Sequence, residues 1–313
     1  MRYAIIGTGA IGGFYGGKLA RAGFDVHFLL HSDYEYVRSN GLRVDSCDGS
    51  FVINHPNVYI SADAMPQCDV VLVALKTTAN GLLPRLLRPL LTDGTLVVLI
   101  QNGVGVEADV EAALPGVQLA AGLAYVCSTK VGPGHIDHTS NGRITIGNYS
   151  CRDTALIDTL LADLGSAGIR AKAADCAEAR WQKAVWNMPF NGPCSVLGQT
   201  TDRVLSSPAG ERLVRALMGE VIGAARACGA TGLDGSVGER MIEMTRNMPP
   251  YSPSMKVDCD LGRPMEIEYL YTKPIAMARE AGYAMPHMEV IEMQLRAIEE
   301  MRRAGAAAQP EQG

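Results

Sequence analysis

Residues 4–13 of the chain read Ala4-Ile5-Ile6-Gly7-Thr8-Gly9-Ala10-Ile11-Gly12-Gly13. The apolar residues predict a short buried strand, and the glycines that follow have the G-x-G-x-x-G spacing of a strand-to-helix turn. In such a turn Gly7 permits the tight bend, Gly9 lets the backbone approach a pyrophosphate, and Gly12 lets the helix pack close to the strand. The pattern predicts a dinucleotide-binding site, and an ordinary glycine-rich turn is the alternative.

The residues after the turn complete a βαβ unit. Residues 14–23 continue as a helix that ends at a glycine, and residues 26–30 form the next apolar run, a second strand. The first N–H groups of the helix would face the phosphates, because they have no partner inside the helix. We therefore expect dinucleotide contacts from all six residues of the motif: Gly7, Thr8, Gly9, Ala10, Ile11 and Gly12.

The residues after the second strand favour NADP over NAD. An NAD-selective site usually has Asp or Glu about 20 residues past the glycines, where the carboxylate holds the ribose 2′-hydroxyl. Here His31 and Ser32 stand at that place, and the first carboxylate, Asp33, comes after the expected end of the strand. A 2′-phosphate would meet no repulsion there, and His31, Ser32 and Arg38 could each donate to it. In the alternative, Ser32 only caps the next helix and His31 faces solvent.

Composition excludes several classes of protein. The chain has 313 residues, 47% hydrophobic and 19% charged, which suits two domains with sizeable cores. A formal net charge of −5 without a dense Lys/Arg run argues against nucleic-acid binding. The longest apolar runs have the length of strands, so we expect no membrane span. We also expect no signal peptide, because the first predicted strand starts at Arg2 and the glycine turn follows directly. Eight scattered cysteines without a C-x-x-C pair predict reduced thiols in a cytoplasmic protein, with no metal site.

The pattern along the chain divides it into two halves. Up to residue 174 strands alternate with helices, and the strands are expected at 68–75, 95–100 and 118–127, with antiparallel additions at 135–139 and 143–147 and an edge strand at 169–171. From residue 175 the pattern is helical, at 175–191, 208–228, 235–247 and 264–304. The prediction is an α/β fold: a Rossmann-type doubly wound sheet over 1–174, an all-helical domain over 175–304, and a frayed tail at 305–313. The active site is expected where the domains meet.

Two polar segments follow predicted strands of the first half. Lys76 comes directly after the strand at 68–75 and could reach a phosphate, a ribose or a substrate carboxylate. A solvated lysine at a helix start is the alternative. Asn102, in Gln101-Asn102-Gly103, follows the next strand and offers both a donor and an acceptor. A plain Asn-Gly turn is an equally good interpretation of that segment.

The helical half contains a polar helix face whose residue types are not those expected of a face exposed to solvent. Lys183, Asn187 and Asn191 are four residues apart, which places them on one side of a helix that also carries two tryptophans. Asparagine is a poor residue for a helix interior, so two of them in one line imply a role beyond the helix. A solvated stripe would more commonly hold Lys and Glu. Pro189 within this segment should kink the helix.

A third polar segment lies at 251–268. Its Ser-Pro-Ser loop contains Ser254, and Glu266 is expected in the first turn of the last predicted helix. Taken in isolation, Glu266 is best explained as complementing the helix dipole.

Together these motifs resemble the ketopantoate reductase (2-dehydropantoate 2-reductase) family. The resemblance extends from the first glycine through Glu266 and the helix after it, and the matching elements are Gly7-Thr8-Gly9-Ala10-Ile11-Gly12, Lys76, Gln101-Asn102-Gly103, Lys183 with Asn187 and Asn191, Ser254-Met255, Asp258 and Gly262-Arg263-Pro264-x-Glu266. The resemblance implies that Lys183 donates the proton and that Asn187, Asn191 and Ser254 hold the substrate together with Lys183.

The resemblance also implies further contacts and shows two departures. Asn102 would touch cofactor and substrate, Glu266 would lie near the nicotinamide, and the loop after a later strand points to Thr129 beside the cofactor. The family commonly has Arg where this chain has His31, and often a further Asn where Thr201 stands. Either change could accompany an altered cofactor or substrate preference.

The chemistry follows from what hydride transfer to a ketone requires. As the hydride reaches the carbonyl carbon, charge grows on the oxygen, and the Lys183 ammonium could both stabilise that charge and deliver a proton without a metal. Burial would lower the pKa of Lys183, whereas the negative charge of Glu266 would raise the pKa of Lys183. The hypothesis is an NADPH-dependent reductase of a small 2-oxo acid, with 2-dehydropantoate the first candidate, in pantothenate biosynthesis. Alternatives are a reductase of another 2-oxo acid and a non-catalytic NADP-binding sensor.

Methionine-rich helices are expected in the core, and a homodimer is possible.

Overall fold

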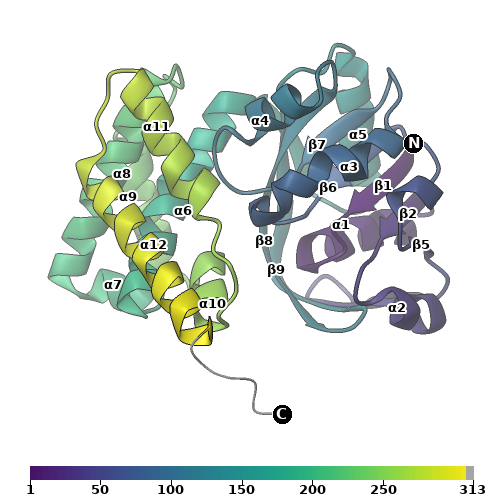
Figure 1. Cartoon of the computed structure of the whole chain (residues 1–313), viewed down its shortest axis with the longest axis horizontal. Helices are drawn as coiled ribbons and strands as arrows, with labels where there is room; N and C mark the ends of the chain where they lie inside the picture. Colours follow the sequence, from purple (N-terminus) through teal and green to yellow (C-terminus); the bar gives the residue numbers. More distant parts are fainter. Residues whose placement is uncertain (308–313) are drawn as a thin grey trace. The chain divides into compact units, whose positions relative to one another are not determined.

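A computed structural model describes residues 1–307, and these residues form two compact units (Figure 1). The first unit comprises Met1–Gln101 and Val106–Ala179. The second comprises Asn102–Gly105 and the residues from Arg180 on. Judged by the contacts between residues, the boundary between the units therefore lies after Ala179 rather than at the expected residue 174. The short segment 102–105 belongs to the second unit, although it lies within the sequence of the first.

The first unit contains a ten-stranded sheet. Its strands are β1 (Arg2–Ile6), β2 (Asp25–Leu29), β3 (Leu42–Ser46), β4 (Phe51–Ile53), β5 (Asn57–Tyr59), β6 (Val70–Val73), β7 (Leu96–Leu99), β8 (Gln118–Gly132), β9 (His135–Asn148) and β10 (Ala171–Asp175). Its helices are α1 (Ala10–Arg21), α2 (Tyr34–Asn40), η1 (Ala62–Ala64), η2 (Thr77–Leu82), α3 (Leu83–Leu87), η3 (Arg88–Leu90), α4 (Val106–Ala113) and α5 (Thr154–Ser166).

Six of the strands have the order of a Rossmann sheet. They run β5-β2-β1-β6-β7-β8, and each neighbouring pair is parallel. The chain winds in one direction from β1 to β5 and in the other from β6 to β8, so the strand order reverses between β1 and β6. The doubly wound sheet predicted from the sequence is confirmed. Ligands of such sheets bind beyond the carboxyl ends of the strands at this switch point.

The sheet is extended beyond the Rossmann order. The long strand β9 pairs antiparallel with β8, as expected, and β3 and β10 both pair parallel with β9. Three strands differ from the sequence expectation. β4 and β5 were not predicted, and the expected edge strand at 169–171 is displaced to β10, since its pairing with β9 begins at Ala171.

Both faces of the sheet are covered. On one face α1 and α5 contribute Phe14, Leu19 and Leu160 to a buried cluster with Ile5 and Leu72 of the strands. The alternate strand residues, which point to the other face, are buried as well, and α4 contacts β8. Burial on both faces explains why the central strands are continuous apolar runs.

The second unit is entirely helical within the described residues. Its elements are α6 (Cys176–Leu197), which begins in the first unit, α7 (Thr201–Ser206), α8 (Pro208–Ala227), α9 (Ser236–Arg246), α10 (Ser254–Asp260), the π-helical turn η4 (Glu268–Thr272), α11 (Lys273–Glu280) and α12 (Pro286–Ala307). The short helices α7 and α10 were not predicted. The single helix expected at 264–304 is wrong: Gly282, at φ +80°, ends α11, and Pro286 starts α12.

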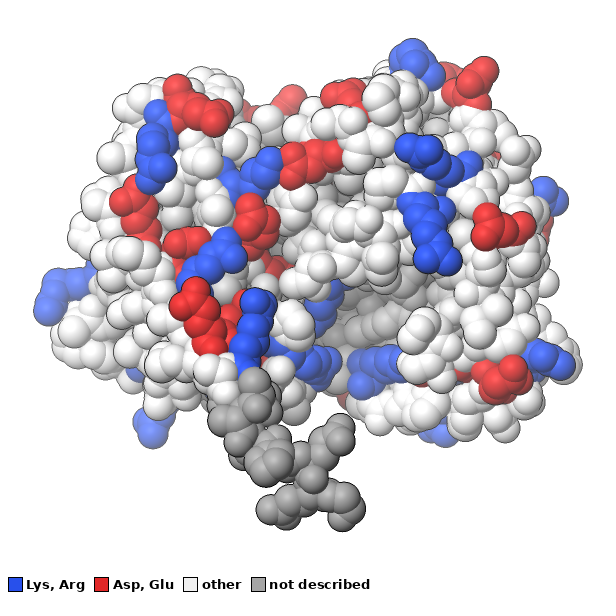
Figure 2. All heavy atoms as spheres, in the orientation of Figure 1, with Lys and Arg blue, Asp and Glu red and all other residues white. Residues whose placement is uncertain are grey.

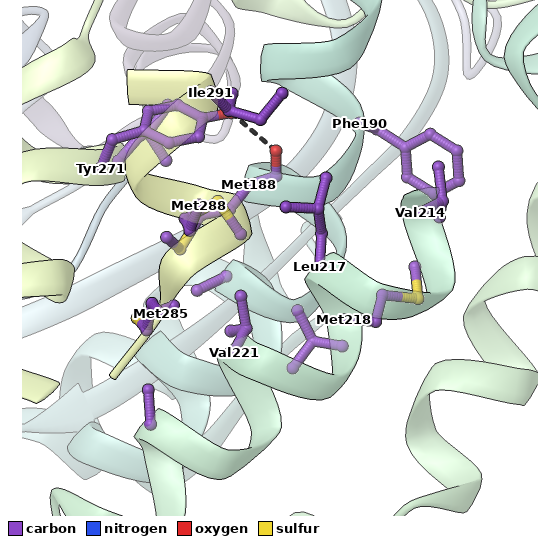
Figure 3. Packing of buried hydrophobic residues seen from close by; sticks show 14 of the residues in the cluster. Met188, Phe190, Val214, Leu217, Met218, Val221, Tyr271, Met285, Met288 and Ile291 are labelled. Atoms are coloured by element: carbon purple, nitrogen blue, oxygen red, sulfur yellow. Dashed lines mark hydrogen bonds between the residues drawn. The ribbon is translucent and has the colours of Figure 1, made fainter. Parts of the chain in front are cut away.

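Helix α6 continues through Pro189 and Pro193 and packs at the centre of the second unit. Figure 3 shows Met188 and Phe190 of α6 against Val214 and Leu217 of α8, with Tyr271 close by. The Tyr271 hydroxyl donates to the Met188 carbonyl at 2.6 Å. This close approach depends on the absence of a side chain at residue 192 of α6, where a Cβ atom would lie 2.6 Å from the Tyr271 oxygen.

The methionines divide between core and surface. Met285 and Met288 are buried, as expected of the core (Figure 3), whereas Met244 and Met293 are exposed. A frayed tail was expected from residue 305, but helix α12 continues to Ala307. The rest of that tail, residues 308–313, lies outside the described residues.

Charges of both signs are interspersed on the surface. On the face that Figure 2 shows, acidic and basic side chains alternate over the helical unit. Arg296 pairs with Glu292 and Glu268, and Arg279 pairs with Glu289. Among residues 1–307 no helix combines the length and the apolar character needed to cross a bilayer. The eight cysteines are all free thiols.

Candidate active site and dinucleotide site

The glycine turn has the shape that a pyrophosphate site requires. Gly7 has φ +95°, and a Cβ there would lie 2.6 Å from the backbone nitrogen of Leu75. A Cβ at Gly12 would lie 2.3 Å from the Gly7 carbonyl oxygen. At Gly9, by contrast, a Cβ would meet nothing within 4 Å. The protein's own packing explains the first two glycines, while Gly9 borders open space, as expected where a ligand approaches the backbone.

The start of helix α1 faces this open space. Gly9 is its N-cap, no side chain caps it, and its first turn has no acidic residue. The Thr8 hydroxyl donates to the Leu29 carbonyl at the end of β2 at 2.9 Å, which ties the turn to that strand. Uncapped N–H groups at the positive end of a helix are a ready anion site. The residues present therefore fit a dinucleotide phosphate.

The loop after β2 has exposed His31 and Ser32 and a buried Asp33. Asp33, rather than Ser32, is the N-cap residue of α2, so the alternative in which Ser32 caps this helix is not supported. The Ser32 hydroxyl instead donates to the Asp33 carboxylate at 3.1 Å. His31 and Ser32, two of the three residues that could donate to a 2′-phosphate, are thus accessible at the end of β2.

The carboxyl ends of β6 and β7 are joined by an amide pair. Gln101 donates to the Leu75 carbonyl at 2.8 Å and to Oδ1 of Asn80 at 2.7 Å. Lys76 lies beside this pair, exposed, at the N-cap of η2. The Nδ2 atom of Asn80 is buried and has no hydrogen-bond partner within residues 1–307. Sequence reasoning missed Asn80, because a lone Asn in a loop carries no pattern.

Asn102 belongs to a segment that is fixed to the helical unit. Val104 donates its N–H to the Tyr269 carbonyl at 3.0 Å. Gly103, at φ +104°, lies so close that a Cβ would be 2.4 Å from that carbonyl oxygen. The Asn-Gly pair is therefore more than a plain turn, because it brings Asn102 to the stretch of chain that follows Glu266.

Lys183 has the most perturbed environment among the predicted site residues. Its side chain is half-buried on α6. The pKa of Lys183 is lowered to about 7, chiefly by burial and then by the positive charge of Arg180, while Glu266 acts in the opposite direction. The sequence left open whether burial or Glu266 dominates, and in the structure burial does. An amine with a pKa near 7 can exchange a proton at neutral pH.

The other two residues of the α6 face are progressively more buried. Asn187 is 8% exposed and Asn191 is 1% exposed. Asn191 Nδ2 donates to the Asn187 carbonyl at 2.9 Å, and Asn191 Oδ1 accepts the backbone N–H of Met255 at 2.9 Å. The direct contact of Asn191 with substrate stays a prediction, and the structure adds a second role for its amide, which bonds to the protein at both atoms. Asn191 holds the first turn of α10, where Ser254 is the first residue.

The comparisons with known proteins agree with these features. The family model described as Ketopantoate reductase PanE/ApbA matches residues 3–150, and the model of its C-terminal part matches residues 175–299. The chain belongs to the ketopantoate reductase family. It is thus an oxidoreductase of a family that uses NAD(P)H.

Individual relatives cover nearly the whole chain. A 2-dehydropantoate 2-reductase of Nostoc sp. is 42% identical, over 97% of each chain. The crystal structure of 2-dehydropantoate 2-reductase from Geobacter metallireducens is 40% identical, with a TM-score of 0.92 over 95% of this chain and 99% of that one. The ternary structure of D-mandelate dehydrogenase with NADH and anilino(oxo)acetate shares the fold at 21% identity, with a TM-score of 0.89 over 97% of this chain and 100% of that one.

The structure shows the surroundings of Glu266 and Thr201, two positions that the sequence analysis related to the ketopantoate reductase family. Glu266 is buried directly before the helical turn at Ile267, not inside the first turn as expected. Thr201, where the family often has Asn, is fully buried, and its hydroxyl has no hydrogen-bond partner within residues 1–307.

Thr129 and its neighbours lie on the long hairpin of β8 and β9. The Ser128 hydroxyl donates to the Ala10 carbonyl at the start of α1 at 3.3 Å. Because side chains alternate along a strand, Thr129 points to the opposite face of the sheet. A contact of Thr129 with the cofactor would therefore have to come from its backbone.

One group of described residues could place three metal-ligand atoms together: Cys47, Asp48 and His138. Protein groups already engage two of these side chains. The Ser46 hydroxyl lies 2.8 Å from Nδ1 of His138, and the Lys18 ammonium lies 3.3 Å from Asp48. Because a neighbouring ammonium opposes a second cation, we assign no metal to this group.

Proposed function

We propose that the protein reduces 2-dehydropantoate to pantoate with NADPH, in pantothenate biosynthesis. The observation that carries the proposal is the environment of Lys183: a lysine with a pKa of about 7 on the helix face that also holds Asn187, and within electrostatic reach of Glu266. The relatives that match the whole chain support the choice of substrate.

The proposed roles follow from what each residue can supply. The phosphates of the dinucleotide would bind at the glycine turn, with Thr8, Ala10 and Ile11 of the motif around Gly9. His31 and Ser32 would contact the 2′-phosphate, which is the basis for NADPH rather than NADH. Lys76, Asn102 and the Thr129 backbone would complete the cofactor site.

The dinucleotide supplies the hydride. Lys183 would hold a proton at Nζ beside the substrate's keto oxygen, stabilise the growing negative charge and then donate that proton. Asn187 and Ser254 would orient the 2-oxo acid, which raises the rate through fixed geometry. Glu266 would sustain the protonated form of Lys183, because its charge raises the pKa of the ammonium group.

The first experiment compares wild type with Lys183→Ala in NADPH oxidation with 2-dehydropantoate. Loss of a general acid costs roughly 10²–10⁴-fold in turnover, and NADPH binding should be retained. Lys172→Ala, at an exposed residue of β10, is the control and should keep full activity. A non-catalytic NADP-binding sensor would bind NADPH without any turnover in wild type.

A panel of 2-oxo acids separates the proposed substrate from the alternative. If another acid had a kcat/KM higher by about two orders of magnitude, the assignment to 2-dehydropantoate would be replaced by that acid. Thr201 is a position to examine in that case, because its hydroxyl is buried without a partner within residues 1–307. Light scattering tests separately whether the chain forms the homodimer that the sequence analysis left open.

A further inference from the structure

The end of strand β8 brings a lysine to the loop that follows β2. β8 extends to Gly132, five residues past its expected end at residue 127, and Lys130 lies in this extension. The Lys130 ammonium is 2.5 Å from Oδ2 of Asp33, and its side chain is 32% exposed. Nothing in the sequence indicated this pairing, because 97 residues separate the two partners.

Both carboxylate oxygens of Asp33 accept hydrogen bonds from the protein. Oδ2 accepts the N–H of Gly134 at 2.9 Å in addition to Lys130, and Oδ1 accepts the Ser32 hydroxyl at 3.1 Å. Burial raises the pKa of Asp33, but the hydrogen bonds from Lys130 and Gly134 outweigh it and hold that pKa below its ordinary value. The ionised carboxylate is thus committed to the hairpin and is not available to hold a ribose hydroxyl, as an NAD-selective carboxylate does.

The register of the hairpin places Lys130 on the side of the dinucleotide site. Ser128, Thr129 and Lys130 pair regularly with His138, Asp137 and Ile136, so Ser128 and Lys130 share one face of the strand. Ser128 on that face contacts the start of α1, and Lys130 contacts the loop after β2. These are the two elements between which the adenosine ribose lies in a Rossmann domain.

We propose that Lys130 recognises the 2′-phosphate of NADPH and that Asp33 positions it. This inference deepens the proposed function and rests on it. An ammonium has three donors, and with one directed at Asp33 the exposed side of Lys130 can donate to a phosphate oxygen. The exposed His31 and Ser32 lie in the same loop. NADH, which has only a hydroxyl at this position, gains little from the lysine.

The test measures binding rather than turnover. Titration calorimetry gives the Kd of NADPH, NADH, 2′,5′-ADP and 5′-AMP for wild type and Lys130→Met. We expect the Kd of NADPH and of 2′,5′-ADP to rise roughly tenfold or more, as for loss of a charge-assisted hydrogen bond. The Kd of NADH and of 5′-AMP should change less than about twofold. Lys130→Arg should retain most of the preference, and Lys172→Met is the control for loss of one positive charge.

Lys130→Met leaves a buried carboxylate without its ammonium partner and so threatens folding. The double variant Asp33→Asn/Lys130→Met removes both charges, and it should show the same selective loss of NADPH affinity. Equal losses for NADPH and NADH, or no loss for NADPH in either variant, would overturn the role of Lys130. These titrations need no substrate, so failure of wild type to reduce 2-dehydropantoate would refute the proposed function and leave the binding result to stand on its own.

Discussion

At the scale of single residues, the pKa of Lys183 determines when a proton can be donated. A general acid must be protonated, so the rate of reduction should fall as the pH rises through about 7, the pKa of Lys183. Glu266 raises that pKa, and burial and Arg180 lower it. Activity should therefore be most sensitive to the charges around this amine near neutral pH.

Glu266→Gln should move the alkaline limb of the kcat/KM profile to lower pH. The substitution keeps the shape of the side chain and removes the charge that favours the ammonium form. The measurement is kcat/KM as a function of pH, with Glu268→Gln as the control, because Glu268 is exposed and paired with Arg296. A limb that stayed in place, or moved to higher pH, would show that Glu266 does not act on Lys183.

Asn191 and Asn187 should respond differently to replacement by alanine. Asn191→Ala leaves the Met255 N–H without its buried acceptor, which costs about 1–3 kcal/mol of unfolding free energy. Asn187→Ala should mainly raise KM or lower kcat. Denaturant unfolding and steady-state kinetics of both variants test this distinction. Equal stability of the Asn191→Ala variant and wild type would show that the bond to Met255 contributes little, and a raised KM in that variant would support a direct contact of Asn191 with substrate.

At the scale of elements, the glycines in the turn between β1 and α1 have different roles: one is needed for packing and another for ligand binding. Gly12→Ala should lower the thermal midpoint, because the new Cβ would lie 2.3 Å from the Gly7 carbonyl oxygen. Gly9→Ala meets no protein atom within 4 Å and should leave the midpoint unchanged while weakening NADPH binding. Thermal scans and binding titrations of the two variants check this. Normal NADPH affinity in Gly9→Ala would contradict a pyrophosphate at this turn.

The helices and strands also show where local sequence was insufficient to predict the fold. The continuous apolar runs of β6 and β7 were predictable because a strand buried on both faces has no polar side. The strands β4 and β5 were not, since three-residue strands gain their stability from pairing with β3 and β2 rather than from their own residues. The break between α11 and α12 depends on Gly282 and Pro286, which the predicted single helix overlooked.

At the scale of the whole molecule, charge argues against a nucleic-acid partner. The formal net charge is −5, and ion pairs such as those of Arg296 and Arg279 neutralise cations locally. We expect no retardation of duplex DNA in a mobility-shift assay even at low salt, where phosphate contacts are strongest. Lysozyme, a basic protein, is a suitable positive control. A retarded band would reveal a basic surface that the composition conceals.

The sequence by itself determined the Rossmann-type sheet of the first unit, the helical second unit and the polar helix face that carries Lys183, because periodicity, glycine spacing and helix spacing are local properties of the chain. Tertiary structure decided the rest. It lowered the pKa of Lys183, it gave the amide of Asn191 a partner in the first turn of α10, and it placed Lys130 against Asp33. Burial and pairing across long separations depend on how distant segments pack, and no local pattern in the chain records them.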